Sequence, residues 1–404
     1  MGISLSFAVK IGRYFVACVG ALAILALKPF ICIRVGSLAS HRIGAYVLEP
    51  ELALCEREAG INQPQNFTYD IWFEEHPISN QALSVIWKRA LLVLPNALVR
   101  PTYLLIKRTG ILKEHIIRTA SRDRDVHRLL QNSKCHLVLS DAEVAKGNEA
   151  MRQFGIPGDA KWVCIHSRDS SYLEKQFPEI EFSYHSYRNS DIDTYVLMAE
   201  TMISLGYYVI RMGSRVAKPM SLRSLYFLDY GSSGKQTDFM DLYLISRCSF
   251  YVGGSAGLDS VPVAFRRPTI MTNFIPVANF QVGWQHLVIP KKLCLFGQTE
   301  PLTIEAISRL GLDEAPETAN YRDASVVIID NTPEEIRDVA MEMHAILGGQ
   351  VEYSDVEKNL QELFWRQFQF IETKHGNGTI LCRVGSQFLL NNSWLLNQSG
   401  KVVC

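Results

Sequence analysis

Residues 162–213 read WVCIHSRDSSYLEKQFPEIEFSYHSYRNSDIDTYVLMAETMISLGYYVIRMG. The run WVCI at 162–165 is apolar and bounded by polar residues, which is typical of a buried parallel strand. Apolar residues then recur at helical spacing over 192–205, and Gly206 is a natural residue to follow a helix end. The segment 207–210 is a second β-rich run. This order of strand, polar loop, helix and strand predicts an open α/β sheet.

Polar residues gather where these two strands end. His166 and Arg168 follow the first strand, Arg188 and Asn189 precede the helix, and Arg211 follows the second strand. Ligands bind at the carboxyl ends of strands in open α/β sheets, and a guanidinium pairs bidentately with phosphate. We therefore predict that these five residues bind the diphosphate of a donor substrate.

A plainer interpretation of the arginines also exists. Arg168 and Arg188 are close in sequence to Asp169 and Asp191, and strand-end arginines commonly form structural ion pairs with such neighbours. Arg211 is then a salt-bridged surface residue. The sequence leaves both interpretations open.

A second candidate for anion binding is the glycine-rich segment between a predicted strand at 250–252 and a predicted helix at 258–265. Its residues Gly253, Gly254, Ser255 and Gly257 let backbone N–H groups approach a phosphate at the amino end of a helix. The alternative is a tight turn required only for packing. The segment is not a dinucleotide-binding G-x-G-x-x-G motif, and the separate run from Gly231 to Lys235 is not a Walker A loop, because only two residues separate its glycines.

Composition excludes several classes of protein. The chain has 404 residues, a hydrophobic fraction of 48%, a charged fraction of 20% and a formal net charge of zero. A chain of this kind folds into more than one globular domain and has no overall field that favours nucleic acid. Its nine cysteines include no C-x-x-C pair, so we expect a reducing compartment, no disulfide framework and no metal site.

The amino terminus contains an unbroken apolar run at 14–27, behind Lys10 and Arg13. The run is shorter than the roughly 20 residues that a membrane span requires. Three interpretations remain: an interfacial helix on a membrane, a signal peptide, or a buried helix. No small-x-small cleavage site stands near its end.

Strands and helices alternate along the rest of the chain, and the best domain boundary is the Gly-Ile-Pro-Gly segment at 155–158. Strands and helices alternate in each of the two halves that this boundary separates, which predicts two doubly wound Rossmann-like domains facing a cleft. The expected divisions are an apolar helix at 1–28, a first domain at 29–156, a second domain at 157–345 and terminal helices with a tail at 346–404. Within them we expect strands at 30–35, 69–73, 135–139 and 326–329, and a helix over 111–130.

Three residues of the first domain are candidates for a catalytic base. His41 stands in a glycine-containing loop after the first strand, and Glu74 and Glu75 follow the second strand. Histidine and carboxylate side chains take up protons in general base catalysis. A single histidine is, however, more often a hydrogen-bonded structural residue.

Four blocks of the sequence carry a resemblance to known proteins: RVGSLASHRIG, CIHSRDSSYL, HSYRNSDIDTYVLMAETMISLGYYVIRMG and DFMDLYLISRCSFYVGGSAGLDSVPVAF. Together they resemble an uncharacterised bacterial family of predicted glycosyltransferases from surface-polysaccharide gene regions. The pair His166 and Arg168 is also similar to the H-x-R donor-phosphate motif of fucosyltransferases with the two-domain GT-B fold. Those relatives continue with a second arginine, where this chain has Asp169, which argues against GDP-fucose as the donor.

The resemblance implies a metal-independent GT-B glycosyltransferase with a nucleotide-sugar donor in the second domain and an acceptor in the first. We expect a glycan or lipid-linked acceptor and a cytoplasmic enzyme, and one interpretation of the apolar amino terminus places it at the inner membrane surface. Two alternatives share the same architecture: a non-catalytic nucleotide-binding scaffold of a polysaccharide assembly, and a sugar-nucleotide epimerase. The nucleotide, the sugar and the anomeric outcome are not specified by the sequence.

Overall fold

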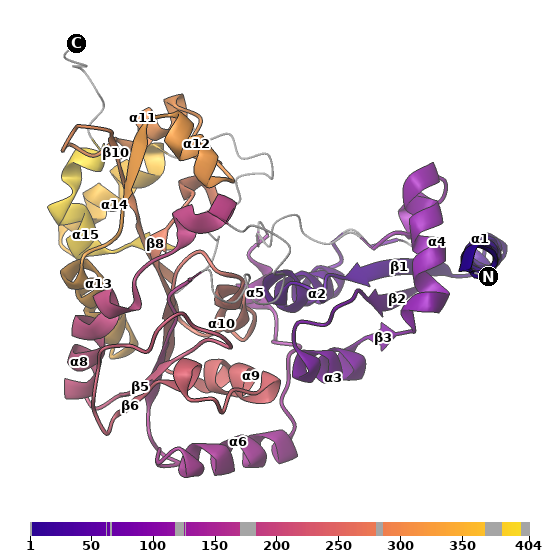
Figure 1. Ribbon diagram of the computed structural model, residues 1–404, viewed down its shortest axis with the longest axis horizontal. Coiled ribbons are helices and arrows are strands. Elements are labelled where there is room, and N and C mark those ends of the chain that lie inside the picture. Colours follow the sequence, from indigo (N-terminus) through magenta and orange to yellow (C-terminus); the bar gives the residue numbers. More distant parts are fainter. Residues whose placement is uncertain are drawn as a thin grey trace. The chain divides into compact units, whose positions relative to one another are not determined.

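The computed structural model describes residues 2–61, 63–64, 67–117, 125, 127–169, 183–279, 286–367 and 382–396, with side chains from residue 9 onward. The chain divides into two compact units (Figure 1). Unit 1 comprises Met1–Asp123 and Asn132–Ser140, and unit 2 comprises Arg124–Gln131 and Asp141–Cys404.

Unit 1 is built on a parallel sheet in the order β1-β2-β3. Alternate residues of β1 and β2 face opposite sides of this sheet, as the strand period of two requires. One face carries Val35 and Phe73, which pack with Ile24 of α1 and Val99 of α4. The other face carries Trp72 and Glu74 and is covered by α2 and α3. The elements are α1 (Gly2–Leu27), β1 (Cys32–Leu38), α2 (Ile43–Glu58), β2 (Thr68–Glu74), α3 (Gln81–Ala90), β3 (Leu92–Val93), α4 (Asn96–Thr109) and η1 (Lys113–His115).

Helix α1 packs against α4 (Figure 1). Ala17 and Ile24 are buried there, and Gly20 permits the close approach, because a Cβ at that position would lie 2.1 Å from Thr102 Oγ1. Most of the other apolar side chains of α1 remain exposed, among them Phe15 and Leu22. The segment Val9–Leu27, with a mean hydropathy of 1.7, is long and apolar enough by length and composition to cross a membrane.

Unit 2 contains a parallel sheet of seven strands in the order β6-β5-β4-β7-β8-β9-β12 and, within the described residues, an antiparallel pair β10-β11. The order reverses between β4 and β7, which is the 3-2-1-4-5-6 arrangement of doubly wound folds. Its helices lie on both faces, with α8 and α13 on one side and α9 and α10 on the other (Figure 1). The strands are β4 (Trp162–Ile165), β5 (Tyr208–Arg211), β6 (Phe227–Leu228), β7 (Phe250–Gly253), β8 (Thr269–Phe274), β9 (His286–Pro290), β10 (Lys292–Leu295), β11 (Val326–Ile329) and β12 (Arg383–Val384).

Helical segments connect these strands. They are α5 (Leu129–Asn132), α6 (Asp141–Gln153), η3 (Ser183–Arg188), η4 (Ile192–Tyr195), α8 (Val196–Ser204), η5 (Tyr230–Ser232), α9 (Asp238–Arg247), η6 (Gly257–Asp259), α10 (Ser260–Ala264), η7 (Val277–Asn279), α11 (Ile304–Arg309), α12 (Thr318–Asp323), α13 (Pro333–Leu347), α14 (Asp355–Gln367), α15 (Ser386–Asn391) and η9 (Ser393–Leu396). The helix expected over 192–205 is present as η4 followed by α8.

Several expected elements differ from the structure. Residues 135–139 form no strand, because this segment bonds to a helix instead: the backbone N–H of His136 donates to the Glu51 carboxylate of α2. Of the helix expected over 111–130, only the short η1 and α5 appear, and 118–124 and 126 lie outside the described residues. The strand at 326–329 exists but pairs antiparallel with β10 and does not join the large sheet.

The division into domains also differs from the expectation. The units part between Ser140 and Asp141, earlier than the expected boundary, because α6 packs on α9 with Gly147 against the ring of Tyr243. The terminal residues belong to unit 2, since β12 pairs with β9. In the described part of unit 1 the named strands are parallel in the order β1-β2-β3, and a single parallel bridge joins Ile116 to Val35 on the other side of β1.

Candidate functional site

The point where the strand order of unit 2 reverses lies between β4 and β7. These strands are paired through Val163, Cys164 and Ile165, and the bonding continues beyond β4, where His166 N donates to Val252 O at 2.8 Å. Doubly wound sheets bind ligands outside the carboxyl ends of the strands at such a point. The segments that follow β4 and β7 contain His166, Arg168 and the glycine-rich residues, so the structure brings these predicted residues to one edge of the sheet.

The glycine-rich segment is shaped by packing. A Cβ at Gly253 would lie 2.4 Å from Asp259 Oδ1, and one at Gly254 would lie 2.0 Å from the backbone oxygen of Thr272. Ser255 has a φ of +54° and exchanges two hydrogen bonds of 3.0 Å with the backbone of Ile275. The two glycines are therefore required by close packing, which is the plainer of the two interpretations.

One amide of this segment is already bonded. Asp259 Oδ2 accepts from the N–H of Ala256 at 2.8 Å, and Asp259 Oδ1 accepts from the Tyr251 hydroxyl at 2.9 Å. Burial raises the pKa of Asp259 to about 6, although both hydrogen bonds oppose the shift. The segment ends in Gly257, where η6 and then the five-residue α10 begin. A carboxylate thus occupies part of the space that the sequence suggests for a phosphate.

His166 lies next to that carboxylate. Its Nδ1 is 3.9 Å from Asp259 Oδ1, beyond hydrogen-bond distance. Burial, with smaller contributions from the charges of Arg211 and Arg168, lowers the pKa of His166 to about 4. The imidazole is therefore neutral at pH 7 and can donate or accept a hydrogen bond, but it supplies no positive charge.

Arg168 and Arg188 are the unusual residues of the site. Arg168 Nη1 donates to His185 O at 2.9 Å and to the side-chain oxygen of Asn189. The guanidinium of Arg188 lies 5.3 Å from the centre of the Tyr187 ring, and its buried Nε has no hydrogen-bond partner in the described structure. Burial, followed by the charge of Arg188, lowers the pKa of Arg168 to about 10, so the Arg168 guanidinium remains cationic at neutral pH.

The structural ion pairs considered for these arginines do not form. Asp191 pairs with Lys218 at 2.7 Å, and Asp169 accepts from the N–H of Ala217 at 2.9 Å. Across the described ranges, neither Arg168 nor Arg188 forms an ion pair with a carboxylate. Two neighbouring cations without an acid between them are electrostatically unfavourable, and an anion would relieve the repulsion.

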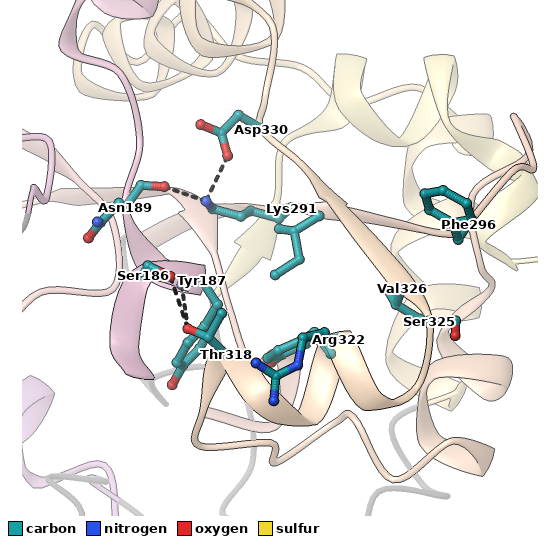
Figure 2. Close-up of a pocket in the computed structure, with 12 residues that line it drawn as sticks. Ser186, Tyr187, Asn189, Lys291, Phe296, Thr318, Arg322, Ser325, Val326 and Asp330 are labelled. Atoms are coloured by element: carbon teal, nitrogen blue, oxygen red, sulfur yellow. Dashed lines mark hydrogen bonds and ion pairs between the residues drawn. The ribbon is translucent and has the colours of Figure 1, made fainter. Parts of the chain in front are cut away.

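Lys291 adds a third cation directly after β9. Its Nζ donates to the backbone oxygen of Asn189 at 2.6 Å and forms an ion pair with Asp330 at 2.6 Å (Figure 2). Burial lowers the pKa of Lys291, and the charge of Arg168 lowers it further. We call Arg168, Arg188 and Lys291 the basic cluster. Asn189 connects two of its members through its side chain and its backbone.

A cavity of about 550 Å³ lies beside Lys291 within unit 2 (Figure 2). The rings of Tyr187 and Tyr321, 5.2 Å apart and nearly parallel, form part of its wall. Thr318 joins α12 to η3 by accepting from Tyr187 N at 3.2 Å. The other lining residues are Ser186, Asn189, Lys291, Phe296, Arg322, Ser325, Val326, Ile328 and Asp330.

Most residues that line this cavity were not predicted from the sequence. The only available signal was the apolar run HLVI at 286–289, which is followed by Pro290 and then by Lys291. A basic residue soon after a strand is the same pattern by which Arg168 was predicted. The residues of α12 and β11 are distant in sequence and carry no motif, so the fold alone brings them to the cavity.

Arg211 is not part of the basic cluster. It is 2% exposed, donates to Lys218 O at 2.6 Å and pairs with Asp229 at 3.3 Å. It therefore holds the segment after β5 in place, and its predicted role in donor binding is corrected to a structural one. The alternative interpretation from the sequence, a salt-bridged surface residue, was right about the ion pair of Arg211 and wrong about its exposure.

The predicted bases of unit 1 separate into two groups. His41 Nδ1 lies 3.0 Å from Glu75 Oε2, both side chains are about one-third exposed, and Ser37 Oγ donates to the other Glu75 oxygen at 2.6 Å. Glu74 is buried and accepts from Tyr46 and Lys88 at 2.5 and 2.8 Å. Burial alone would raise the pKa of Glu74, but these hydrogen bonds lower it, so Glu74 is a structural anion and not a base.

Potential metal ligands occur elsewhere. Among the described residues, one group of histidine, cysteine and carboxylate atoms lies within 4.8 Å of one another: Glu51, Cys55 and His136 of unit 1. None of the predicted site residues belongs to this group.

Comparisons with known proteins give structural similarities only. No family model and no curated protein sequence matches the chain. Heptosyltransferase II of E. coli has 15% identity and a TM-score of 0.41 over 79% of this chain and 99% of that one. The glycosyltransferase family 9 protein of Veillonella parvula has 10% identity and a TM-score of 0.46 over 80% and 97%. The E. coli heptosyltransferase WaaC, solved with ADP-2-deoxy-2-fluoro heptose, has 12% identity and a TM-score of 0.31 over 65% and 93%. These TM-scores are below 0.5, so the assignment of a function depends on the residues of the site itself.

Proposed function

We propose that the chain is a glycosyltransferase that moves a sugar from a nucleoside-diphosphate donor to an acceptor hydroxyl. The observation that carries this proposal is the basic cluster, in which Arg168 and Arg188 lie together at the carboxyl edge of the sheet and have no carboxylate partner among the residues that the structure describes. Such a cluster suits a diphosphate, because guanidinium groups pair with phosphate oxygens in a bidentate geometry.

The cavity beside the cluster supports a nucleoside as the rest of the donor. Its volume of about 550 Å³ is in the range of small-ligand sites, and its wall combines two stacked tyrosines with hydroxyl and carbonyl groups. Lys291 lies where the cluster meets the cavity. We assign the diphosphate to Arg168, Arg188 and Lys291, and the nucleoside to the wall formed by Tyr187 and Tyr321.

The reaction breaks the bond between the anomeric carbon and the donor phosphate oxygen and forms a bond from that carbon to the acceptor oxygen. The acceptor proton passes to a base, and the nucleoside diphosphate leaves with the electron pair of the broken bond. Fixed cations stabilise the charge that develops on this leaving group, in the place of a divalent ion. His41, polarised by Glu75, is the proposed base.

The amide groups at 253–257 have a smaller part than the sequence suggested, because Asp259 accepts from one of them. His166, which is neutral, would donate one hydrogen bond to the donor and carry no charge. A two-domain GT-B organisation, a hexosyl or deoxyhexosyl donor and an acceptor from surface polysaccharide or glycoconjugate synthesis belong to the same proposal. So does a cytoplasmic location with α1 on the inner membrane surface.

The test is a panel of UDP-, GDP-, CMP- and ADP-linked sugars, with ADP-heptose included because one structural neighbour was solved with a related compound. One donor should raise the melting temperature of the chain and be transferred or slowly hydrolysed. Arg168→Ala should lower turnover by about 100-fold or more, as removal of a transition-state donor group does. The exposed Arg309→Ala is the matched control.

The outcomes separate the alternatives. An isomerised sugar without transfer identifies an epimerase, and a melting shift without any reaction identifies a nucleotide-binding scaffold. Full turnover by Arg168→Ala would remove the basic cluster from the mechanism.

A further inference from the structure

Helix α2 carries three potential ligands on one face, outside the site described above. Glu51, Cys55 and Glu58 are spaced at i, i+4 and i+7, which places them on one stripe of the helix. Glu51 and Cys55 are completely buried. His136 reaches them from the segment Asn132–Ser140, by which the chain returns to unit 1.

The distances among these groups are short. His136 Nδ1 lies 3.2 Å from Glu51 Oε1, and Cys55 Sγ lies 3.8 Å from the same oxygen. All three ligand atoms lie within 4.8 Å of one another. The backbone N–H of His136 also donates to the Glu51 carboxylate at 3.2 Å, which fixes the orientation of the carboxylate.

These separations fit a common central ion. Zinc bonds of roughly 2.0 to 2.3 Å in a tetrahedron place nitrogen and oxygen ligands about 3.3 Å apart and sulfur and oxygen ligands about 3.6 Å apart. The observed 3.2 and 3.8 Å are close to those values. We propose that unit 1 binds a zinc-class divalent cation through Glu51, Cys55 and His136 Nδ1.

The second nitrogen of His136 supports this assignment. Its Nε2 lies 3.2 Å from Glu58 Oε1, so the imidazole can bind an ion through Nδ1 while Nε2–H donates to a carboxylate. That arrangement is usual for histidine ligands of zinc. Lys134 lies 3.4 Å from Glu58 and balances its charge. The Glu51 carboxylate and a Cys55 thiolate then supply the two negative charges that neutralise a divalent ion.

The proposed ion has a structural role. It would fasten residues 132–140 to α2, in a segment that has no strand or helix of its own apart from the end of α5. The segment belongs to unit 1, although α6, which follows it directly, belongs to unit 2. A bond to α2 would therefore add to the contacts that attach this segment to unit 1, such as the hydrogen bond from Arg89 Nη2 to Val138 O. This site is separate from the basic cluster and does not depend on the proposed function.

The experiment uses the full chain, stripped with a chelator and titrated with Co²⁺ as a spectroscopic substitute for Zn²⁺. We expect one equivalent to bind, a thiolate-to-cobalt charge-transfer absorption, displacement by Zn²⁺ and a higher melting temperature with either ion. Cys55→Ser should abolish the charge-transfer absorption, and Cys135→Ser, which changes the neighbouring half-buried cysteine, should leave it intact.

A second variant keeps the test valid if Cys55→Ser fails to fold. Glu58 is 41% exposed near the end of α2, and Glu58→Gln should weaken Co²⁺ binding by about 10- to 100-fold without unfolding the chain. Absence of stoichiometric Co²⁺ binding by the wild-type chain would overturn the proposal, as would a charge-transfer absorption that survives in folded Cys55→Ser. The cluster would then be an ion pair between His136 and two carboxylates. Donor binding measured on the same samples tests the proposed function independently.

Discussion

At the scale of single residues, Arg188 is the residue whose position is best explained by ligand binding and not by the stability of the fold. Its charge lowers the pKa of Arg168, its Nε has no hydrogen-bond partner in the described structure, and it forms no ion pair there. A side chain kept in such a position lowers the stability of the chain without a ligand, and natural proteins accept that cost mainly where binding requires it.

Arg188→Met keeps the length of the side chain and removes its charge. We expect the free energy of unfolding to rise by about 1 kcal/mol without a donor, because the repulsion with Arg168 disappears. The same variant should lose the melting shift that the donor produces in the wild-type chain. Urea unfolding with and without donor measures both effects, with Arg309→Met as the control. A destabilised variant that still binds donor would show that Arg188 is structural.

Asp241 of α9 is a second residue whose charge is poorly accommodated. Burial raises the pKa of Asp241 to about 7, and its Oδ1 lacks a hydrogen-bond partner within the described residues. Because the folded pKa lies above the unfolded value of 3.8, ionisation destabilises the folded chain as the pH rises from about 4 to 7.

Asp241→Asn should therefore stabilise the chain at pH 8 by about 2 to 4 kcal/mol, at 1.36 kcal/mol for each unit of pKa difference. The gain should disappear near pH 4, where the aspartic acid is protonated in both states. Denaturant unfolding at the two pH values gives the comparison. Asp355→Asn, at a fully exposed position, should show no such change between the two values. An equal effect of Asp241→Asn at both values would mean that the cause is packing and not charge.

At the scale of elements, the sequence predicted best where periodicity and position agree. The run at 162–165 is wholly buried as β4, and the helix expected over 192–205 is present as η4 and α8. The sequence predicted elements poorly where their hydrogen-bond partners are distant in the chain. An isolated apolar run such as 135–139 looks like a strand, but a strand exists only where another strand accepts its hydrogen bonds.

The candidate site shows the same limit. His166 and Arg168 were predicted from one rule, that ligands bind at the carboxyl ends of parallel strands, and the strand order of unit 2 brings their segment to the point of reversal. Arg211 satisfied the same rule and is nevertheless a structural residue, because its partner Asp229 lies 18 positions away in a different segment. Ion pairs and metal ligands of this kind depend on tertiary contacts that periodicity does not contain.

Helix α1 offers a test of the proposed location. Its buried side rests on α4 through Ala17 and Ile24, whereas Phe15 and Leu22 are 69% and 64% exposed. Phe15→Glu and Leu22→Glu should therefore reduce binding to anionic vesicles and leave the free energy of unfolding within about 0.5 kcal/mol of the wild type. Ile24→Ala should instead destabilise unit 1 by about 2 to 4 kcal/mol, because it opens a cavity.

Vesicle co-sedimentation and urea unfolding separate the two sides of the helix. If the glutamate variants bind vesicles as well as the wild type does, the exposed side of α1 is not a membrane surface, and the location proposed for the chain is wrong.

At the scale of the whole molecule, the proposal divides the chemistry between the units. Unit 2 contains the cations and the cavity that we assign to the donor, and unit 1 contains His41 and Glu75, the proposed base and its partner. Substitution of the base in unit 1 should then lower the rate of transfer and leave donor affinity unchanged, whereas substitution of the cations in unit 2 should lower both.

His41→Ala tests this division. Loss of a general base should lower kcat for transfer by about 10²- to 10⁴-fold, and the dissociation constant of the donor should stay within about twofold of the wild type. Glu75→Gln should lower kcat less, because it removes the partner of the imidazole and not the base itself.

Glu74→Gln is the matched control: Glu74 accepts from Tyr46 and Lys88, so its loss should lower the melting temperature and leave kcat of the folded enzyme unchanged. For each of the three variants, donor titration gives the dissociation constant and initial rates on the same samples give kcat. A full transfer rate in His41→Ala would place the base elsewhere, whereas a parallel loss of donor affinity would show that His41 belongs to the donor site and that the two functions are not divided.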